Sequence, residues 1–335
     1  MKVLLDSSKP FYKANLHTHT DLSDGKYSVE ETKAEYKKRG YSIVAFTDHE
    51  HLIDNSHLDD EDFLTITSCE VAIKEFPEQS TLKNFMMKVC HLNFYALDQH
   101  NTVTPCYSSI YDHYINDKNR DLIKHNGEYE RIHSAEGINE MIRMANEQGF
   151  LVAYNHPSWS LETALDYLDY EGLFAIEIYN TGCVQAGHGD DERAFNDILR
   201  TGKKIYCTAA DDAHNTAGFE SQYRDAFDGW VCINAEKLEY STIMEALKNG
   251  DFYASTGPQI KSLTRDGNIV KIETSGCKKI NLKTKGRRTQ KVIAKDGEEI
   301  TSAEFELREA DGYFRIRVED AYGKRAYTQA YPVNE

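Results

Sequence analysis

Histidine and carboxylate side chains follow a short apolar segment near the start of this sequence. His17 and His19 come after Leu16 and are one residue apart, so both would project from the same face of a strand. Asp24 follows in a turn that contains Gly25. Imidazole and carboxylate groups bind divalent metal ions. The stretch is therefore either a strand end that holds polar residues or the first part of a metal site, whose other ligands would lie later in the chain.

Further candidates occur at comparable places. They are Asp48 and His49 after IVAF, Glu70 after LTITSC, His91 after MMKVC, His156 after LVAY, and Asp212 and His214 after IYCTAA. A single histidine of this kind is more often a hydrogen-bonded structural residue than a ligand. Six of them at equivalent strand ends, together with carboxylates that would repel one another without bound cations, predict a shared metal site.

Helices and strands alternate along the first 250 or so residues and would position these side chains. In SVEETKAEYKKRGYSIVAFTDH, Ser28 and Glu31 have capping-box spacing, Gly40 can end the helix, and residues 43–46 read as a strand. Two later segments repeat the scheme; their features are the candidate cap Ser134, the stops Gly149 and Gly202, and strands at 151–154 and 205–209. This alternation predicts parallel strands joined by helices, as in a barrel whose strand ends meet on one face.

The pattern changes near residue 259. The segment AEFELREADGYFRIRVEDAYGKRAYTQAYPV alternates apolar and polar residues and has turn signals at Asp311-Gly312 and Gly323. We therefore expect a barrel domain over residues 1–258 and a small antiparallel β-sandwich over residues 259–335. Residues 99–133, which are rich in Tyr, Asn and Asp, are expected to form an insertion or lid over the site.

The ordered motifs HTHTDLSDG, TDH, an isolated Glu, CHL, NHP and DAH resemble those of the PHP (polymerase and histidinol phosphatase) domain metal-dependent phosphoesterases. LKNGDFYASTGPQI and the C-terminal segment further resemble the carbaryl-hydrolase-like (CehA/McbA) metallohydrolase branch. The resemblance covers nearly the whole chain. It implies a distorted (β/α)7 barrel of the PHP fold with up to three metal ions.

The resemblance also implies how the ligands divide. His17, His19, Glu70 and Asp212 would hold one ion, Glu70 would bridge to a second held by His91 and His156, and Asp24, His49 and His214 would hold a third. Asp24 stands where some members have histidine. Glu70, Asp212 and His214 would act in catalysis through hydroxide formed from water at the metal ions.

The expected activity is that of a metal-dependent phosphoric ester hydrolase acting on a small phosphomonoester or phosphodiester. Mixed imidazole and carboxylate ligation suits two to three ions of zinc, manganese or iron, and disfavours calcium. A carboxylic or carbamate ester hydrolase of the same fold is an alternative, because the same chemistry can attack a carbonyl carbon. A 5'-3' exonuclease or oligonucleotide phosphodiesterase is a third hypothesis.

Several other residues are candidates with a structural alternative. Asp48 could orient His49 or cap the next helix. Asn155 and Asn180 could touch substrate or serve the fold, and Arg193 could bind phosphate or lie on a solvated helix face. Seven histidines match no motif and are expected on the surface or in the lid; these are His51, His57, His100, His113, His125, His133 and His188.

Composition limits the possible partners. The 335 residues carry a formal net charge of −16, which disfavours nucleic acid, although residues 278–295 contain basic side chains and no acid. That stretch is expected to be a charged sheet edge or else a contact surface for a phosphorylated substrate. No run of about 18 apolar residues and no signal-peptide pattern is present. Seven cysteines without a C-x-x-C pair predict free thiols and a cytoplasmic protein.

Overall fold

Seven strands form a distorted barrel in the computed structural model, which describes residues 1–76 and 87–334. The strands follow the order β10-β9-β8-β5-β4-β3-β2. Their bounds are β2 (Phe11–Asn15), β3 (Ile43–Phe46), β4 (Leu64–Lys74), β5 (Val89–Ala96), β8 (Phe150–Tyr154), β9 (Ala175–Asn180) and β10 (Tyr206–Ala210). A bridge between Thr18 and Ala213, just beyond β2 and β10, closes the ring. The fold class expected from the sequence is thereby confirmed.

One strand runs against the others. β2, β3 and β4 are mutually parallel, as are β8, β9 and β10. β5 is antiparallel to both of its neighbours, β4 and β8. The prediction of parallel strands is therefore wrong for β5, because the chain turns back so that Val89 pairs with Lys74.

Three of the helices begin or end next to the residues that the sequence signals. The helix bounds are α1 (Val29–Lys38), α3 (Ala135–Glu147), α4 (Ala164–Tyr167), α5 (Thr181–Gln185), α6 (Glu192–Thr201) and α7 (Tyr240–Asn249). Ser28 and Glu31 form the expected capping box at α1, and the Ser134 side chain accepts a hydrogen bond from the backbone N–H of Gly137 at α3. Gly202 ends α6 in the left-handed conformation that glycine adopts without steric cost.

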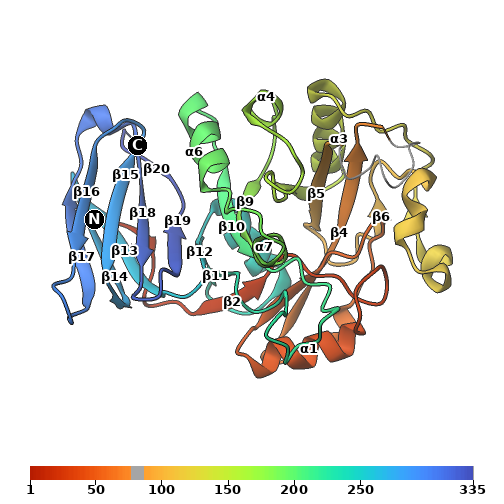
Figure 1. Ribbon diagram of the computed structural model, residues 1–335, viewed down its shortest axis with the longest axis horizontal. Helices are drawn as coiled ribbons and strands as arrows, with labels where there is room; N and C mark the ends of the chain where they lie inside the picture. The colour runs from red at the N-terminus through yellow and green to blue at the C-terminus, as the bar shows by residue number, and fades with distance from the viewer. Residues whose placement is uncertain (77–86, 335) are drawn as a thin grey trace.

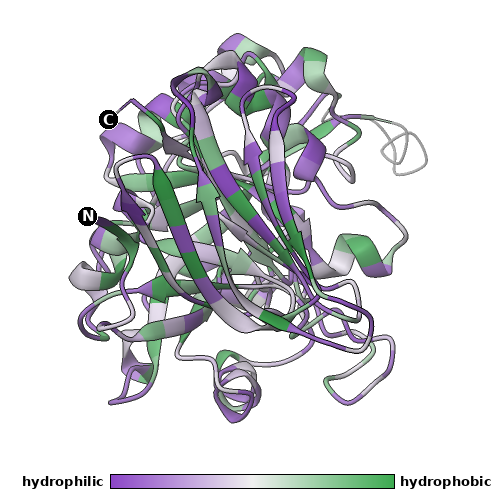
Figure 2. Cartoon of the chain, turned by 90° about the vertical axis from the view of Figure 1, so that its left-hand side faces the viewer, coloured by the Kyte–Doolittle hydropathy of each residue, from purple (hydrophilic) through white to green (hydrophobic). Residues whose placement is uncertain are grey.

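Two antiparallel sheets form the C-terminal domain, which Figure 1 shows on the left in blue. One has the order β1-β13-β14-β17, and the other includes β19, β18, β15 and β16, with β20 on β18. The bounds are β1 (Lys2–Leu5), β13 (Ile260–Asp266), β14 (Ile269–Cys277), β15 (Lys279–Thr284), β16 (Thr289–Ile293), β17 (Ile300–Glu306), β18 (Tyr313–Glu319), β19 (Arg325–Thr328) and β20 (Tyr331–Pro332). Hydrophobic and hydrophilic residues alternate along these strands (Figure 2).

Two further elements connect the domains. β11 (Trp230–Asn234) and β12 (Phe252–Ser255) lie between β2 and β19, so one continuous sheet runs from the barrel into the sandwich. β1 belongs to residues 1–258, the range expected for the barrel, but it pairs with β13 because fully buried Leu5 packs into the sandwich core. The first strand of the chain thus ties the two domains together.

Short turns make up residues 99–133. They contain β6 (Val103–Thr104), β7 (Lys124–His125) and the 3₁₀ turns η2 (Ser109–Tyr114) and η3 (Asp117–Leu122); two other 3₁₀ turns are η1 (Ser56–Leu58) and η4 (Glu309–Asp311). Buried Arg131 forms two hydrogen bonds, of 2.9 and 2.6 Å, with the carboxylate of Glu50. Asn119 donates to the carbonyl of Leu22, next to the loop that carries Asp24. The segment is thereby held against the barrel.

All seven cysteines are buried and unpaired. Among the described residues, no helix is both long enough and apolar enough to cross a membrane.

Candidate metal centre

The donor side chains gather at one rim of the barrel. His17 and His19 follow β2, His156 follows β8, and Asp212 and His214 follow β10. Two donors deviate from the expected position at a C-terminal strand end: Glu70 lies within β4, and His91 is the third residue of β5. His91 still reaches the same rim because β5 is antiparallel, which places it in register with Ala72 of β4.

The first group consists of His17, His19, Glu70 and Asp212. The Nε2 atom of His17 lies 3.3 Å from Glu70 Oε1 and 3.2 Å from Asp212 Oδ1. The Nε2 atom of His19 lies 3.1 Å from the same Asp212 oxygen and 3.5 Å from Glu70 Oε2. Four ligand atoms therefore converge on one point.

The second group shares Glu70 with the first. It contains Glu70, His91 and His156. The Nδ1 atom of His91 lies 3.0 Å from Glu70 Oε1, and the Nε2 atom of His156 lies 3.3 Å from that oxygen. A carboxylate shared in this way can bridge two ions.

The third group contains His19, Asp24, His49 and His214. Asp24 is at its centre, with Oδ2 3.5 Å from His49 Nε2 and Oδ1 3.4 Å from His214 Nε2. His19 was not expected here, but its Nδ1 atom lies 3.7 Å from Asp24 Oδ1. The two ring nitrogens of His19 thus face two different groups.

Glu177 is a participant that sequence reasoning missed. Its Oε1 accepts a hydrogen bond of 2.7 Å from Nδ1 of His17, and its Oε2 accepts one from the backbone N–H of His156. With the proton held on Nδ1, the Nε2 lone pair of His17 is directed toward the first group. The available signal was an acidic residue in the apolar strand AIEIYN, since an unpaired buried glutamate is costly.

Two asparagines support the carboxylates. Asn155 donates to Glu70 Oε1 at 2.8 Å, and Asn180 donates to Glu177 Oε2 at 2.9 Å and to Asp212 Oδ2 at 3.2 Å. Both are buried. They therefore hold the ligand carboxylates in place, whereas the sequence left open whether they touch substrate.

The donor set fits divalent ions. The Nδ1 atoms of His19 and His49 are buried and have no hydrogen-bond partner in the part of the chain that the structure describes. Buried polar atoms normally make hydrogen bonds, so these two ring nitrogens, the second of which lies 3.2 Å from Glu70 Oε2, fit a role in holding a metal ion. The donors are buried except at one side, where the side chains of Asp24 and His214 are 40% and 31% exposed. The centre is therefore more exposed to solvent on the side of Asp24 and His214.

Opposite charges in the metal centre shift one another's pKa values. Burial alone would raise the pKa of Glu70, but His91 and His17 outweigh it and hold that pKa well below its usual range. For His17, burial is outweighed by Asp212, Glu177 and Glu70, so its pKa lies well above its usual value. The carboxylates therefore stay charged and require positive charge beside them, which protons or divalent cations can supply.

The backbone at the rim is locally strained or tightly packed. His156 and Asp212 have φ values of 28° and 53°, a region that non-glycine residues rarely adopt and that is common at functional sites. A Cβ atom on Gly25 would lie 2.5 Å from the backbone of His19. Only glycine fits at that position in the loop that presents Asp24.

Asp48 plays a different part from either one expected. Its Oδ1 accepts hydrogen bonds from the Thr20 backbone N–H and the Ser23 hydroxyl, each at 2.7 Å, and its Oδ2 accepts from the Thr20 hydroxyl. It caps no helix, since the next helical turn begins at Ser56. Asp48 therefore fixes the loop that carries Asp24 rather than orienting His49.

Arg193 lies away from the metal groups. Its guanidinium pairs with Asp197 of the same helix at 2.6 Å, and its side chain is 82% exposed. This is the solvated helix face that the sequence offered as the alternative.

One of the seven remaining histidines differs from the surface or lid position expected for it. His51 is buried and contacts the carbonyl of His49 through Nδ1, whereas His133 lies within residues 99–133 and pairs with Glu162. The others are exposed or half-buried.

Comparisons with known proteins found a matching family model and similar solved structures. A family model described as the PHP domain matches residues 15–205, more than half of the chain. One similar solved structure is a two-domain protein from Bacteroides vulgatus containing a predicted PHP-like metal-dependent phosphoesterase, with 14% identity, a TM-score of 0.47, and coverage of 98% of this chain and 96% of that chain.

Two other solved structures match a smaller part of the chain. One, from Bifidobacterium adolescentis, is named as a candidate metal-dependent phosphoesterase, with 14% identity, a TM-score of 0.36, and coverage of 64% of this chain and 91% of that chain. The other is an amidohydrolase from Chromobacterium violaceum with bound sulfate and no metal, with 15% identity, a TM-score of 0.35, and coverage of 57% of this chain and 84% of that chain. No protein of curated function matches the chain.

Proposed function

Because the chain belongs to the PHP domain family, we propose that it is a metal-dependent phosphoesterase that hydrolyses small phosphomonoesters or phosphodiesters. The observation that carries this proposal is the joining of three donor groups through Glu70 and His19. Neighbouring sites of this kind are suited to phosphoryl chemistry, in which charge develops on both the attacking and the leaving oxygen. The net charge of −16 favours small substrates over nucleic acid.

Divalent zinc, manganese or iron, when bound, would polarise the phosphoryl oxygens and lower the pKa of water. The chain's own contribution is orientation. Glu177 holds a proton on Nδ1 of His17, and the carbonyl of Asp212 accepts the Nδ1 proton of His214 at 3.1 Å. Each interaction leaves the Nε2 lone pair of its histidine directed into the centre. The Asp24 and His214 side remains open to substrate.

The test combines metal content with turnover. Purified protein is loaded with zinc, manganese or iron and assayed on a panel of phosphate monoesters and diesters, in parallel with Glu70→Ala, His214→Ala and the surface control His100→Ala. Glu70→Ala should lose two ions and His214→Ala one, and both should lose most activity, whereas the control should match the wild type. Loaded wild-type protein that cleaves no phosphate ester would refute the proposal.

Hydrolysis of carboxylic or carbamate esters, the activity implied by the carbaryl-hydrolase-like resemblance, is a second candidate. The observation in its favour is that half-exposed Trp159 packs against the rings of His91 and His156, with centroids 5.2 and 5.0 Å apart, and offers an aryl group an apolar wall. Cleavage of aryl acetate and aryl phosphate at equal metal loading separates the two candidates.

An exonuclease has less support. The basic stretch 278–295 lies in β15 and β16 at the edge of the sheet, and two of its cations are already paired, Lys283 with Glu192 and Arg288 with Asp311. Cleavage of single-stranded oligonucleotides that is suppressed by Arg287→Glu would reverse this ranking.

A further inference from the structure

A cavity of about 450 Å³ adjoins the metal centre at His91. Its lining comes from β4 and β5, from the segment before β5, from residues 113–114 and from the loops after β8 and α5; it consists of Lys74, Met87, Lys88, Val89, His91, His113, Tyr114, Trp159, Leu161 and His188. This volume is in the range of small-molecule sites and exceeds what a phosphate group alone needs. An occupant that touches His91 therefore has room for a substantial group beyond the phosphoryl centre.

One wall of the cavity is apolar and accessible. Trp159 and Leu161, from the loop that follows His156, are 39% and 44% exposed. Large apolar side chains that remain exposed in a concave site mark a binding surface. Tyr114 also lines the cavity and packs on the ring of His49, with centroids 4.8 Å apart.

Lys74 brings a positive charge to the cavity, and the acidic group that acts on it, Glu50, is itself paired with Arg131. Its ammonium lies 4.7 Å from the ring centroid of Tyr114 and makes no ion pair within residues 1–76 and 87–334. Lys88 lines the same cavity, but its ammonium is paired with Asp166 at 2.6 Å. Lys74 is only 9% exposed, so an unpaired charge at this place is costly unless an anion joins it.

The position of Lys74 relative to the metal centre is fixed by β4. Lys74 and Glu70 are four residues apart in one strand, so their side chains project from the same face. At about 3.3 Å per residue their Cα atoms are about 13 Å apart. An anion at Lys74 would therefore belong to a part of the substrate that is separated from the scissile phosphate.

We propose that this cavity binds the leaving group of the substrate, that the apolar wall contacts a ring or other apolar body, and that Lys74 binds a second anionic group on it. The inference rests on the proposed phosphoesterase function and specifies its substrate class: phosphoesters whose leaving group carries an additional carboxylate or phosphate.

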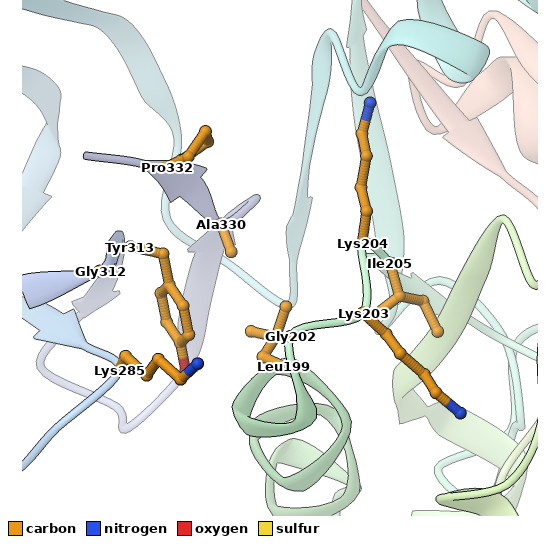
Figure 3. Close-up of a pocket in the computed structure, with 10 residues that line it drawn as sticks. All are labelled: Leu199, Gly202, Lys203, Lys204, Ile205, Lys285, Gly312, Tyr313, Ala330 and Pro332. Atoms are coloured by element: carbon orange, nitrogen blue, oxygen red, sulfur yellow. The ribbon is translucent and has the colours of Figure 1, made fainter. Parts of the chain in front are cut away.

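A second cavity lacks these features. It has a volume of about 340 Å³ and lies between α6 and the C-terminal sheet (Figure 3). The chains of Lys203 and Lys204 extend away from it, and the Lys203 ammonium is engaged by the carbonyls of Leu168 and Tyr170. None of its lining residues belongs to a metal group.

The test uses matched substrates and matched variants. Carboxyphenyl phosphate is compared with the uncharged carbamoylphenyl phosphate, as 3- and 4-isomers, in wild type, Lys74→Met and Lys88→Met. The wild type should prefer the carboxylate, and Lys74→Met should reduce that preference in kcat/KM about 10-fold or more, the usual effect of a hydrogen bond to a charged group. Lys88→Met should keep the preference. Phosphophenyl phosphate, run alongside, tells whether phosphate or carboxylate is preferred as the second anion.

A binding measurement separates this inference from the activity itself. In a Trp230→Phe background Trp159 is the only tryptophan, so its fluorescence reports binding of 4-hydroxybenzoate to the metal-loaded protein. Binding should weaken about 10-fold or more in Lys74→Met, while circular dichroism remains unchanged. Normal phosphatase activity with the same carboxylate preference in Lys74→Met would overturn the inference alone. No hydrolysis of any ester, with Lys74-dependent binding intact, would overturn the proposed function alone.

Discussion

Glu192 is one of the points at which the C-terminal domain is attached to the barrel, and its replacement by glutamine should measure the contribution of that contact. Glu192 begins α6 and is buried. Its Oε1 lies 2.5 Å from both Arg315 and Lys283, and its Oε2 lies 2.9 Å from Arg317. All three cations belong to the C-terminal sheet, so one carboxylate joins both domains.

The size of the effect follows from the pKa of Glu192. Burial alone would raise that pKa, but Arg315 and Lys283 outweigh burial and lower it from 4.5 to about 2. The difference corresponds to about 3 kcal/mol of stability, at about 1.4 kcal/mol per factor of ten in proton affinity. Because the folded-state pKa is lowered, this stability is fully present above pH 4.5 and is lost as the pH falls toward 2. Breaking a buried ion pair typically costs 3–5 kcal/mol, which agrees.

Urea unfolding at pH 7 tests this value. Urea is chosen because guanidinium salts screen ion pairs. Glu192→Gln keeps the size of the side chain and should lower the free energy of unfolding by about 3 kcal/mol. The control is Glu220→Gln. The Glu220 side chain pairs with Arg39 but is 78% exposed, so this substitution should lower the free energy of unfolding by less than about 1 kcal/mol.

The second half of the experiment is the same unfolding measurement at acidic pH. The difference between wild type and Glu192→Gln should shrink as the pH falls below 4.5, because the wild type then loses the same charge. A loss below 1 kcal/mol at pH 7, or a difference independent of pH, would refute the view that this carboxylate stabilises the folded protein through its three cations.

Three further predictions concern the metal centre. Glu177→Gln removes the anionic acceptor of the His17 Nδ1 proton and should weaken zinc or manganese binding about 10- to 100-fold in calorimetric titration; unchanged affinity would contradict the orienting role. Asp48→Ala removes the hydrogen bonds that hold the loop carrying Asp24, so elemental analysis should find one ion fewer. Wild-type metal content would show that the loop keeps its conformation without Asp48. Removal of metal by a chelator should lower the unfolding temperature, and readdition of zinc or manganese should restore it, because ions that bind only the folded state stabilise it; an unchanged temperature would argue against cations in this pocket.

Much of the fold is local in origin and could be predicted from the sequence. The Ser28 and Glu31 capping box, the stop at Gly202 and the strand at 43–46 depend on residues a few positions apart, and each is present in the structure. The alternation of apolar and polar residues in the C-terminal segment likewise predicted antiparallel strands. Such patterns specify an element because hydrogen bonding and side-chain period act within it.

Strand direction and the partners of buried polar groups depend on residues far apart in the chain. The sequence could not indicate that β5 is antiparallel, since its apolar run is compatible with either direction. It also gave no sign that β1 joins the sandwich, where Leu5 pairs with Leu263, a residue far away in the chain.

The metal centre also has features that the sequence determined and features that depend on the tertiary structure. The sequence by itself determined which side chains could bind metal ions, because donor chemistry resides in residue type. Only the tertiary structure decided that His19 faces two groups, that Glu177 holds His17 and that Asp48 supports the Asp24 loop. The physical reason is that hydrogen bonds and coordination act over about 3 Å in space, whereas the His17–Glu177 and Thr20–Asp48 contacts join residues 160 and 28 positions apart in the chain.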